Sequence, residues 1–96
     1  MNTSEIIQRL QQEQKILQNM GARSLSLFGS VARNEAHANS DLDLLVDLSE
    51  NCGLFELFRL RRYLEEQLNC SIDLGTVEAL REHLRQPILE EAIHVF

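Results

Sequence analysis

The segment from Asp41 to Leu48, with the sequence DLDLLVDL, restricts the fold of this chain more than any other part of it. Apolar residues occupy every second position, and aspartates fill most of the positions between them. Side chains alternate between the two faces of a β-strand, so this pattern predicts a strand with one face in the core. The apolar face comprises Leu42, Leu44, Val46 and Leu48, and the opposite face carries Asp41, Asp43, Leu45 and Asp47. Asp41 and Asp43 would then lie roughly 6.5 Å apart on that face, a spacing that lets two carboxylates share divalent ions such as Mg²⁺.

A Gly-Ser pair precedes this strand, and ten residues separate Ser30 from Asp41. Residues 24–28 read as a short strand, and residues 30–36 as a short helix, so Gly29-Ser30 stands at a strand-to-helix turn. Gly29 would let the backbone approach phosphate groups, Ser30 offers a hydroxyl, and the helix N-terminus presents free N–H groups to an anion. Arg33 lies on the same side of that helix and could contact a terminal phosphate. An exposed surface arginine explains it equally well.

A third acidic residue follows from the same alternation in residues 70–74, CSIDL. Cys70, Ile72 and Leu74 point one way, which leaves Asp73 on the opposite face. If this strand lies beside the Asp41–Leu48 strand, three carboxylates converge. The alternative is that Asp73 is a solvated polar residue with no chemical role.

The remaining pattern predicts one domain, residues 1–96, of the α/β (α+β) class. Its expected form is a small mixed sheet of three to four strands flanked by helices. A helix is expected over 4–19, capped by Thr3 or Ser4, and another over 54–68 with a core stripe of Leu54, Leu57, Phe58, Leu64 and Leu68. A further helix over 77–84 should break near Pro87, and residues 93–96 should form a terminal strand.

Composition limits the possible partners. The 96 residues carry a formal charge of −6, which argues against a broad electrostatic track for nucleic acid. No basic region followed by an apolar run opens the chain and no long apolar run interrupts it, so neither a signal peptide nor a membrane span is expected. Cys52 and Cys70 lack metal-ligand spacing and are expected to be reduced core residues of a cytoplasmic protein.

These motifs resemble those of the minimal nucleotidyltransferases (MNT) of the DNA polymerase β-like superfamily. The resemblance rests on residues 27–33 (LFGSVAR), residues 40–46 (SDLDLLV) and Asp73. It implies that Asp41 and Asp43 bind two Mg²⁺ ions and that Asp73 completes the metal site and helps to activate the acceptor hydroxyl. It also implies that Gly29 and Ser30 hold the triphosphate of ATP. Asn34 stands where many relatives have Gly, a mild departure because Asn also tolerates left-handed geometry.

The resemblance further implies a partner. Chains of this kind are typically the antitoxin of a pair with a HEPN-type ribonuclease toxin, which they would inactivate by transferring AMP from ATP to a tyrosine. A hetero-oligomer is then expected, with the partner supplying the acceptor hydroxyl. Two alternatives stay open: transfer of a nucleotide to a small molecule, and a non-catalytic antitoxin that acts by binding alone.

Overall fold

Four strands form one mixed sheet in the computed structural model, which describes residues 2–29, 42–80 and 82–96. The strands are β1 (Ala22–Phe28), β2 (Leu42–Leu48), β3 (Ile72–Thr76) and β4 (Ile93–His94), in the order β3-β2-β1-β4. β1 runs antiparallel to both β2 and β4, whereas β2 and β3 are parallel. The mixed sheet expected from the sequence is confirmed.

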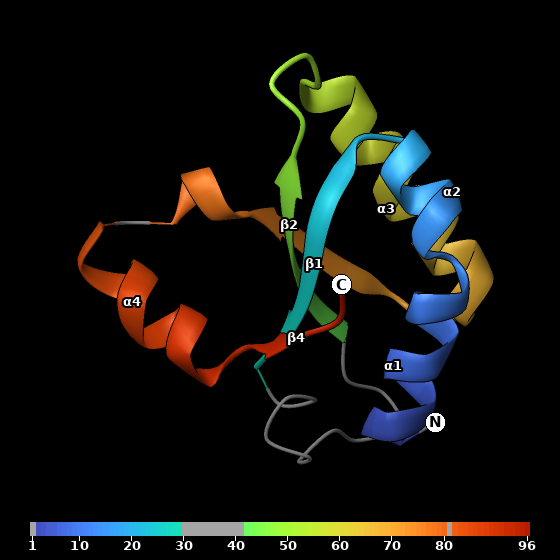
Figure 1. Ribbon diagram of the computed structural model, residues 1–96, viewed down its shortest axis with the longest axis horizontal. Helices are drawn as coiled ribbons and strands as arrows, with labels where there is room; N and C mark the ends of the chain where they lie inside the picture. Colours follow the sequence, from blue (N-terminus) through green and yellow to red (C-terminus); the bar gives the residue numbers. More distant parts are fainter. Residues whose placement is uncertain (1, 30–41, 81) are drawn as a thin grey trace.

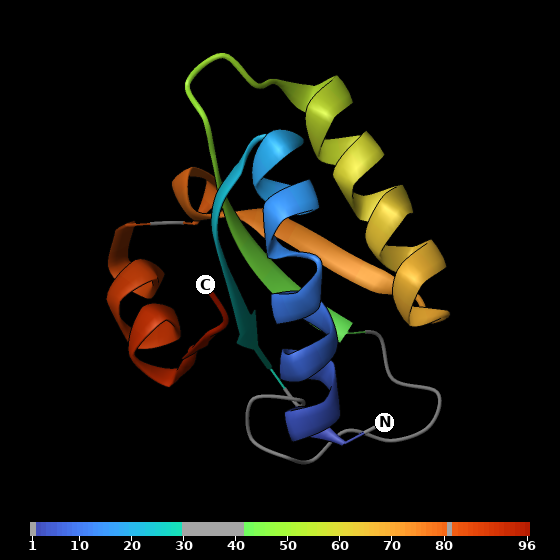
Figure 2. The same cartoon turned by 45° about the vertical axis from the view of Figure 1, so that its right-hand side comes forward.

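Helices cover both faces of this sheet (Figure 1). The helices α1 (Thr3–Gln12), α2 (Gln14–Asn19) and α3 (Leu54–Leu68) lie on one side, and α4 (Glu82–Glu91) lies on the other. Figure 2 shows α1 and α2 stacked end to end, with α3 beside them. A short 3₁₀ turn, η1 (Val77–Ala79), connects β3 toward α4.

The main core lies between the sheet and the three helices α1, α2 and α3. It contains the apolar face of β2 predicted from the sequence, together with the inward residues of the neighbouring elements. These buried residues are Ile6, Leu10, Leu17, Ala22, Leu25, Leu27, Leu42, Leu44, Val46, Leu48, Leu60, Leu64, Leu68, Ile72, Leu74 and Val95. Leu45 is also buried, although it lies on the opposite face of β2 with Asp43 and Asp47. That face is therefore partly apolar, and not uniformly acidic.

The first helix differs from the prediction in two ways. Asn2, and neither Thr3 nor Ser4, caps it, because the Asn2 side chain accepts a hydrogen bond from the Glu5 N–H at 2.9 Å. The helix also breaks at Glu13, where φ is −94° and ψ is 3°. The Glu13 carboxylate accepts a 2.6 Å hydrogen bond from the Tyr63 hydroxyl of α3. The break therefore lies where α1 and α2 are joined to α3.

The bounds of α3 agree with the prediction, but its core stripe does not. Leu64 and Leu68 are buried and Leu57 packs against the core, whereas Leu54 and Phe58 are 64% and 54% exposed. Leu60 is buried in their place, and it was not predicted. The apolar run at the start of α3 has more large side chains than the core side of the helix can cover, and the sequence pattern alone did not separate the two faces.

The C-terminal third also departs from the prediction. β3 covers Ile72–Thr76 in place of 70–74, and only η1 forms directly after it. The last helix begins later and contains Pro87 in its second turn. Proline lacks the N–H that would bond to the carbonyl of His83, but the helix continues, as the hydrogen bond from Ala92 N–H to the Ile88 carbonyl shows (3.0 Å). The helix predicted over 77–84 is therefore wrong.

Candidate active site

Three neighbouring strands bring their ends together at one end of the sheet. In the antiparallel pair, Phe28 of β1 stands opposite Asp43 of β2, and in the parallel pair Asp43 stands opposite Asp73 of β3. Adjacent strands lie about 4.8 Å apart, so the backbones at Asp43 and Asp73 are close neighbours. Gly29 follows Phe28 directly. The strand pairing therefore gathers Gly29, Asp43 and Asp73 into one site.

The side-chain directions of the two acids agree with the prediction from strand alternation. Ile72 and Leu74 are buried, whereas Asp73 between them is exposed. Asp43 is half-buried between the buried Leu42 and Leu44. Both carboxylates lie on the sheet face opposite the main core. Asp43 is therefore partly covered by the protein, whereas Asp73 is open to an incoming molecule.

The backbone angle at position 29 and the nearby Asp43 carboxylate together require a glycine there. Its φ is +73°, a left-handed conformation that L side chains rarely adopt. A Cβ at this position would overlap the Asp43 Oδ2 atom and lie 3.1 Å from the Asp43 Cγ. The sequence suggested that Gly29 makes room for phosphate groups. The structure shows a more direct reason: the absence of a side chain at Gly29 leaves space for the Asp43 carboxylate.

Three of the predicted site residues, Ser30, Arg33 and Asp41, lie outside the described residues. So do the short helix expected over 30–36 and residues Asn34 and Ser40. The structure consequently tests the arrangement of Gly29, Asp43 and Asp73 alone.

Glu65 of α3 contacts the strand that carries Asp73, a contact for which the sequence pattern gives no signal. Its carboxylate accepts a hydrogen bond from the Ile72 N–H at 3.1 Å, and Leu42 N–H donates to the Ser71 carbonyl at 3.0 Å. Together these bonds fix the start of β3 to α3 on one side and to β2 on the other. Sequence spacing gives no signal for the Glu65 contact, because it depends on how residues 69–71 turn the chain back.

The fourth residue of the acidic face, Asp47, belongs to a different part of the molecule. It forms an ion pair with Arg23 at 3.0 Å near the other end of β2. This contact raises the pKa of the Arg23 guanidinium, chiefly through the hydrogen bond from Arg23 to Asp47. Asp47 therefore acts as a partner of Arg23, apart from the acids at the start of β2 and β3.

The described residues contain two of the three proposed metal ligands. Carboxylate oxygens are the ligands that Mg²⁺ prefers, and the pairing of Asp43 with Asp73 places two of them side by side. No cluster of three or more His, Cys, Asp or Glu side chains suited to a metal occurs among the residues that the structure describes, a set that does not include Asp41. The donor chemistry at Asp43 and Asp73 fits a divalent ion of this kind.

Other features of the described part lie apart from these acids. Cys52 and Cys70 form no disulfide, and both are partly exposed and packed against the core. Arg62 and Glu66 form an i,i+4 ion pair along α3, at 3.6 Å. Across the described ranges, no helix is long and apolar enough to span a membrane.

Comparison with known proteins adds independent evidence. The family model described as polymerase beta, nucleotidyltransferase, matches residues 4–96. The chain belongs to this family. The resemblance inferred from the motifs is thereby confirmed, and the protein is a nucleotidyltransferase with the mixed sheet and flanking helices of that fold.

Two relatives illustrate the family at high coverage. The Methanocaldococcus jannaschii protein MJ0435, whose name assigns it to the protein adenylyltransferases, is 39% identical over 95 residues and covers 99% of each chain. The protein adenylyltransferase MntA of Thermococcus cleftensis is 32% identical over 83 residues, or 86% of this nucleotidyltransferase and 84% of the relative.

Solved structures share the fold. A protein described as a minimal nucleotidyltransferase aligns with a TM-score of 0.87 at 36% identity, covering 97% of this chain and 95% of its own. A toxin–antitoxin complex with AMP-PNP gives a TM-score of 0.73 at 22% identity, covering 100% and 73%. A complex of tri-AMPylated Shewanella oneidensis HEPN toxin with MNT antitoxin gives 0.69 at 17% identity, covering 98% and 71%. At these two lower identities, the likeness concerns the fold.

Proposed function

We propose that this nucleotidyltransferase is the antitoxin of a HEPN-type ribonuclease toxin and inactivates it by transferring AMP from ATP to a tyrosine. The observation that carries the proposal is the pairing of Asp43 with Asp73 beside Gly29, because nucleotidyl transfer requires acidic metal ligands next to a phosphate site. The names of the relatives supply the acceptor class, a protein. The neighbouring toxin–antitoxin structures suggest the partner and the nucleotide.

In this proposal Asp41, Asp43 and Asp73 hold two Mg²⁺ ions, while Gly29, Ser30 and Arg33 bind the triphosphate. Bound Mg²⁺ would offset the charge of the triphosphate and of the leaving pyrophosphate. The exposure of Asp73 suits contact with an acceptor, whereas the half-buried Asp43 is enclosed beside Gly29. ATP is the expected donor in the cytoplasm, the compartment in which Cys52 and Cys70 would stay reduced.

At phosphorus, the transfer forms one bond and breaks one, and a proton moves from the tyrosine to a carboxylate. The tyrosine oxygen forms a bond to the α-phosphorus of ATP, and the bond from that phosphorus to the bridging oxygen of pyrophosphate breaks. Pyrophosphate leaves with the bonding electron pair. Asp73 accepts the hydroxyl proton, so the tyrosine carries AMP at the end of the step.

The test uses ATP labelled at the α-phosphate, Mg²⁺ and the HEPN-type protein encoded beside this chain. We expect label on the partner, and peptide mass spectrometry should place one AMP on a tyrosine. Asp43→Asn should remove the labelling. Glu66→Gln, the same chemical change at an exposed position of α3, should preserve it. Absence of label with the folded wild-type chain and a folded partner would contradict the proposal.

A further inference from the structure

The start of α3 exposes three large apolar side chains. Leu54, Phe55 and Phe58 are 64%, 84% and 54% exposed, whereas the leucines further along the same helix, Leu60, Leu64 and Leu68, are buried. Isolated exposed apolar residues are common, but three within five positions of one helix form a patch that water disfavours. We call these three residues the α3 apolar patch.

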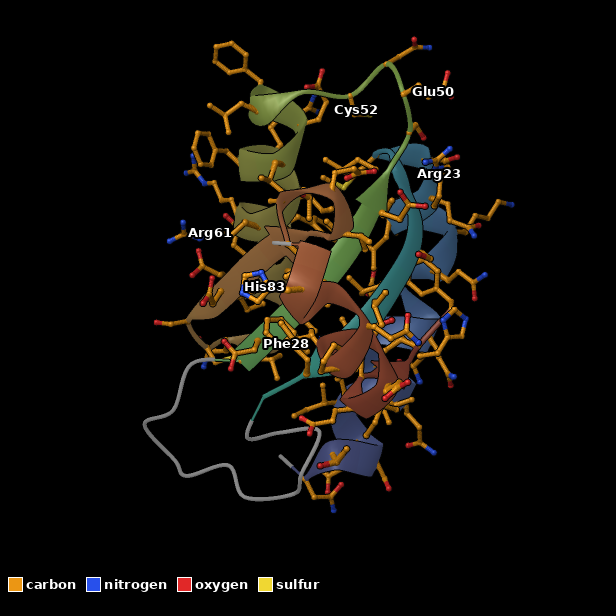
Figure 3. The ribbon with its side chains drawn as sticks, turned by 90° about the vertical axis from the view of Figure 1, so that its left-hand side faces the viewer. Arg23, Phe28, Glu50, Cys52, Arg61 and His83 are labelled. Atoms are coloured by element: carbon orange, nitrogen blue, oxygen red, sulfur yellow. The ribbon has the colours of Figure 1, made fainter. Side chains whose placement is uncertain are left out.

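A groove of about 490 Å³ adjoins this patch. Leu54 belongs to both, and Leu48, Leu57 and Ala79 add further apolar wall. The groove lies beyond the last residues of β2 and β3, whereas Asp43 and Asp73 lie near their first residues. Figure 3 shows Arg23, Glu50 and Cys52, which line it, at one end of the molecule and Phe28 toward the other. The patch and groove are therefore separate from the candidate active site.

The rim of the groove is acidic. Glu50 and Glu78 line it and are exposed, and both contribute to raising the pKa of Arg23. The Arg23 guanidinium is already engaged by Asp47 at 3.0 Å. Three carboxylates thus face one guanidinium, and the rim keeps an excess of negative charge. A ligand for this surface should combine apolar side chains with positive charge.

The negative charge of the chain decides among three possible occupants: a second copy, an anionic membrane and a partner protein. A second copy of this chain would also carry a formal charge of −6, so like charges would oppose self-association. An anionic membrane surface is disfavoured for the same reason, because Glu50 and Glu78 would face its headgroups. A partner protein with Lys or Arg beside apolar residues would be attracted to the acidic rim and not repelled by it.

We propose that the α3 apolar patch and the adjoining groove dock a partner protein through a helix that carries apolar side chains flanked by Lys or Arg. This inference rests on the proposed function, in that the docked protein is the one that presents the acceptor hydroxyl. Leu48 follows Asp43 by five positions in β2, about 16 Å along the strand. A partner docked at the groove leaves Asp43 and Asp73 accessible to another part of its surface.

The test measures the affinity of the neighbouring HEPN-type protein for this chain by isothermal titration calorimetry. Phe55→Ser combined with Phe58→Ser should weaken binding at least about tenfold, since exposed aromatic anchors dominate interfaces. Glu50→Lys combined with Glu78→Lys should weaken it by a similar factor, more at low salt than at high salt. Ile16→Ser, which changes an apolar residue of α2 that is 47% exposed, should leave the affinity unchanged.

The outcomes separate this inference from the proposed function. If both double variants bind like the wild type while AMP is still transferred, the docking surface is wrong and the function stands. If the double variants lose binding but no AMP transfer occurs with the wild type, the docking surface stands and the function is wrong. A wild-type chain that binds no partner, or that forms a dimer which Phe55→Ser dissociates in sedimentation, would also overturn the docking surface.

Discussion

At the residue scale, the closeness of Gly29 to the Asp43 carboxylate restricts the described part of the site most, because it leaves no room for a side chain at position 29. The positive φ of Gly29 and the proximity of the Asp43 carboxylate act together, because any side chain at position 29 meets both. The glycine thus couples the turn after β1 to the position of a proposed metal ligand. Small displacements of such a ligand are costly in catalysis.

Gly29→Ala should therefore reduce AMP transfer about a hundredfold, because the new methyl group displaces the Asp43 carboxylate. Stability should fall by about 1 to 2 kcal/mol from the left-handed backbone, measurable by thermal denaturation. Gly53→Ala is the matched control. A Cβ there would lie 3.7 Å from the nearest side-chain atom, Glu56 Oε2, so the rate of transfer at saturating partner should be unchanged. Full activity in Gly29→Ala would contradict this account of the turn.

Glu65 is proposed as a positioning residue for Asp73, through its hydrogen bond to the Ile72 N–H. Glu65→Ala should lower the kcat of transfer about tenfold, with a smaller change in the KM for ATP. Glu65→Gln keeps an acceptor oxygen, so its kcat should stay close to that of the wild type. Arg61→Ala removes only the 3.8 Å ion pair to Glu65 and serves as the control. If Glu65→Gln were as slow as Glu65→Ala, the hydrogen bond would not be the cause.

Asp73, Glu65 and Gly29 show how far the sequence predicts the site at the scale of single residues. Strand alternation was sufficient to assign Asp73 to the same face as Asp43, because the period of a strand is fixed. It was insufficient for Glu65, whose contact joins a helix to a strand through a turn of unpredicted shape. The reason for Gly29 was also only partly found, since the clash with Asp43 needs the register between β1 and β2.

At the element scale, α3 joins three parts of the molecule. Its first turns carry the exposed apolar patch. Tyr63 bonds to Glu13 at the break between α1 and α2, and Glu65 bonds to the backbone of β3. The Gly53 N–H donates to the Glu56 carboxylate at 2.8 Å, which lowers the pKa of Glu56 and closes the first turn. Asn69, with φ of 52°, ends the helix in the left-handed region.

Tyr63→Phe should lower the free energy of unfolding by about 1 kcal/mol, because it removes the hydrogen bond to Glu13 from a partly exposed site. AMP transfer should be unchanged. Glu13→Gln, which keeps an acceptor oxygen, should lose less stability than Tyr63→Phe. Urea denaturation followed by circular dichroism measures both changes, and equal stability of Tyr63→Phe and the wild type would contradict the role of this bond.

The same pair has a pH dependence. The hydrogen bond to Glu13 is the main cause that raises the pKa of the Tyr63 phenol above its usual value. Above about pH 10 the unfolded chain loses this proton while the folded chain retains it, so stability falls as the pH rises. The stability advantage of the wild type over Tyr63→Phe should therefore shrink above about pH 10, as denaturation curves on either side of that pH would show.

The sequence predicts a helix correctly where the apolar pattern is long and a glycine marks its start. The limits of α3 followed from Gly53 and fifteen residues of helical pattern, whereas the faces of its first turns did not, because apolar residues occur there on several sides. Pro87 is the sequence signal that misplaces the last helix, because proline usually favours a helix end. A proline in the second turn removes one backbone hydrogen bond, and the helix extends past that loss.

At the scale of the whole molecule, the mixed sheet gives the two ends of the fold different properties. Because β2 and β3 are parallel and β1 is antiparallel to them, the end of β1 meets the starts of both acidic strands. The opposite end gathers the apolar patch and the acidic groove. The strand order and directions could not be predicted from strands this short, although they decide which side chains meet.

The central claim is that Asp43 and Asp73 act together in one nucleotidyl-transfer site. The most direct test is the single-turnover rate of AMP transfer to the HEPN-type partner for Asp43→Asn, Asp73→Asn and the double variant. Each single variant should fall to nearly the rate of the double variant, because residues that act as a unit are not additive, and circular dichroism should show wild-type folding. Transfer at the wild-type rate by folded Asp73→Asn would contradict the claim.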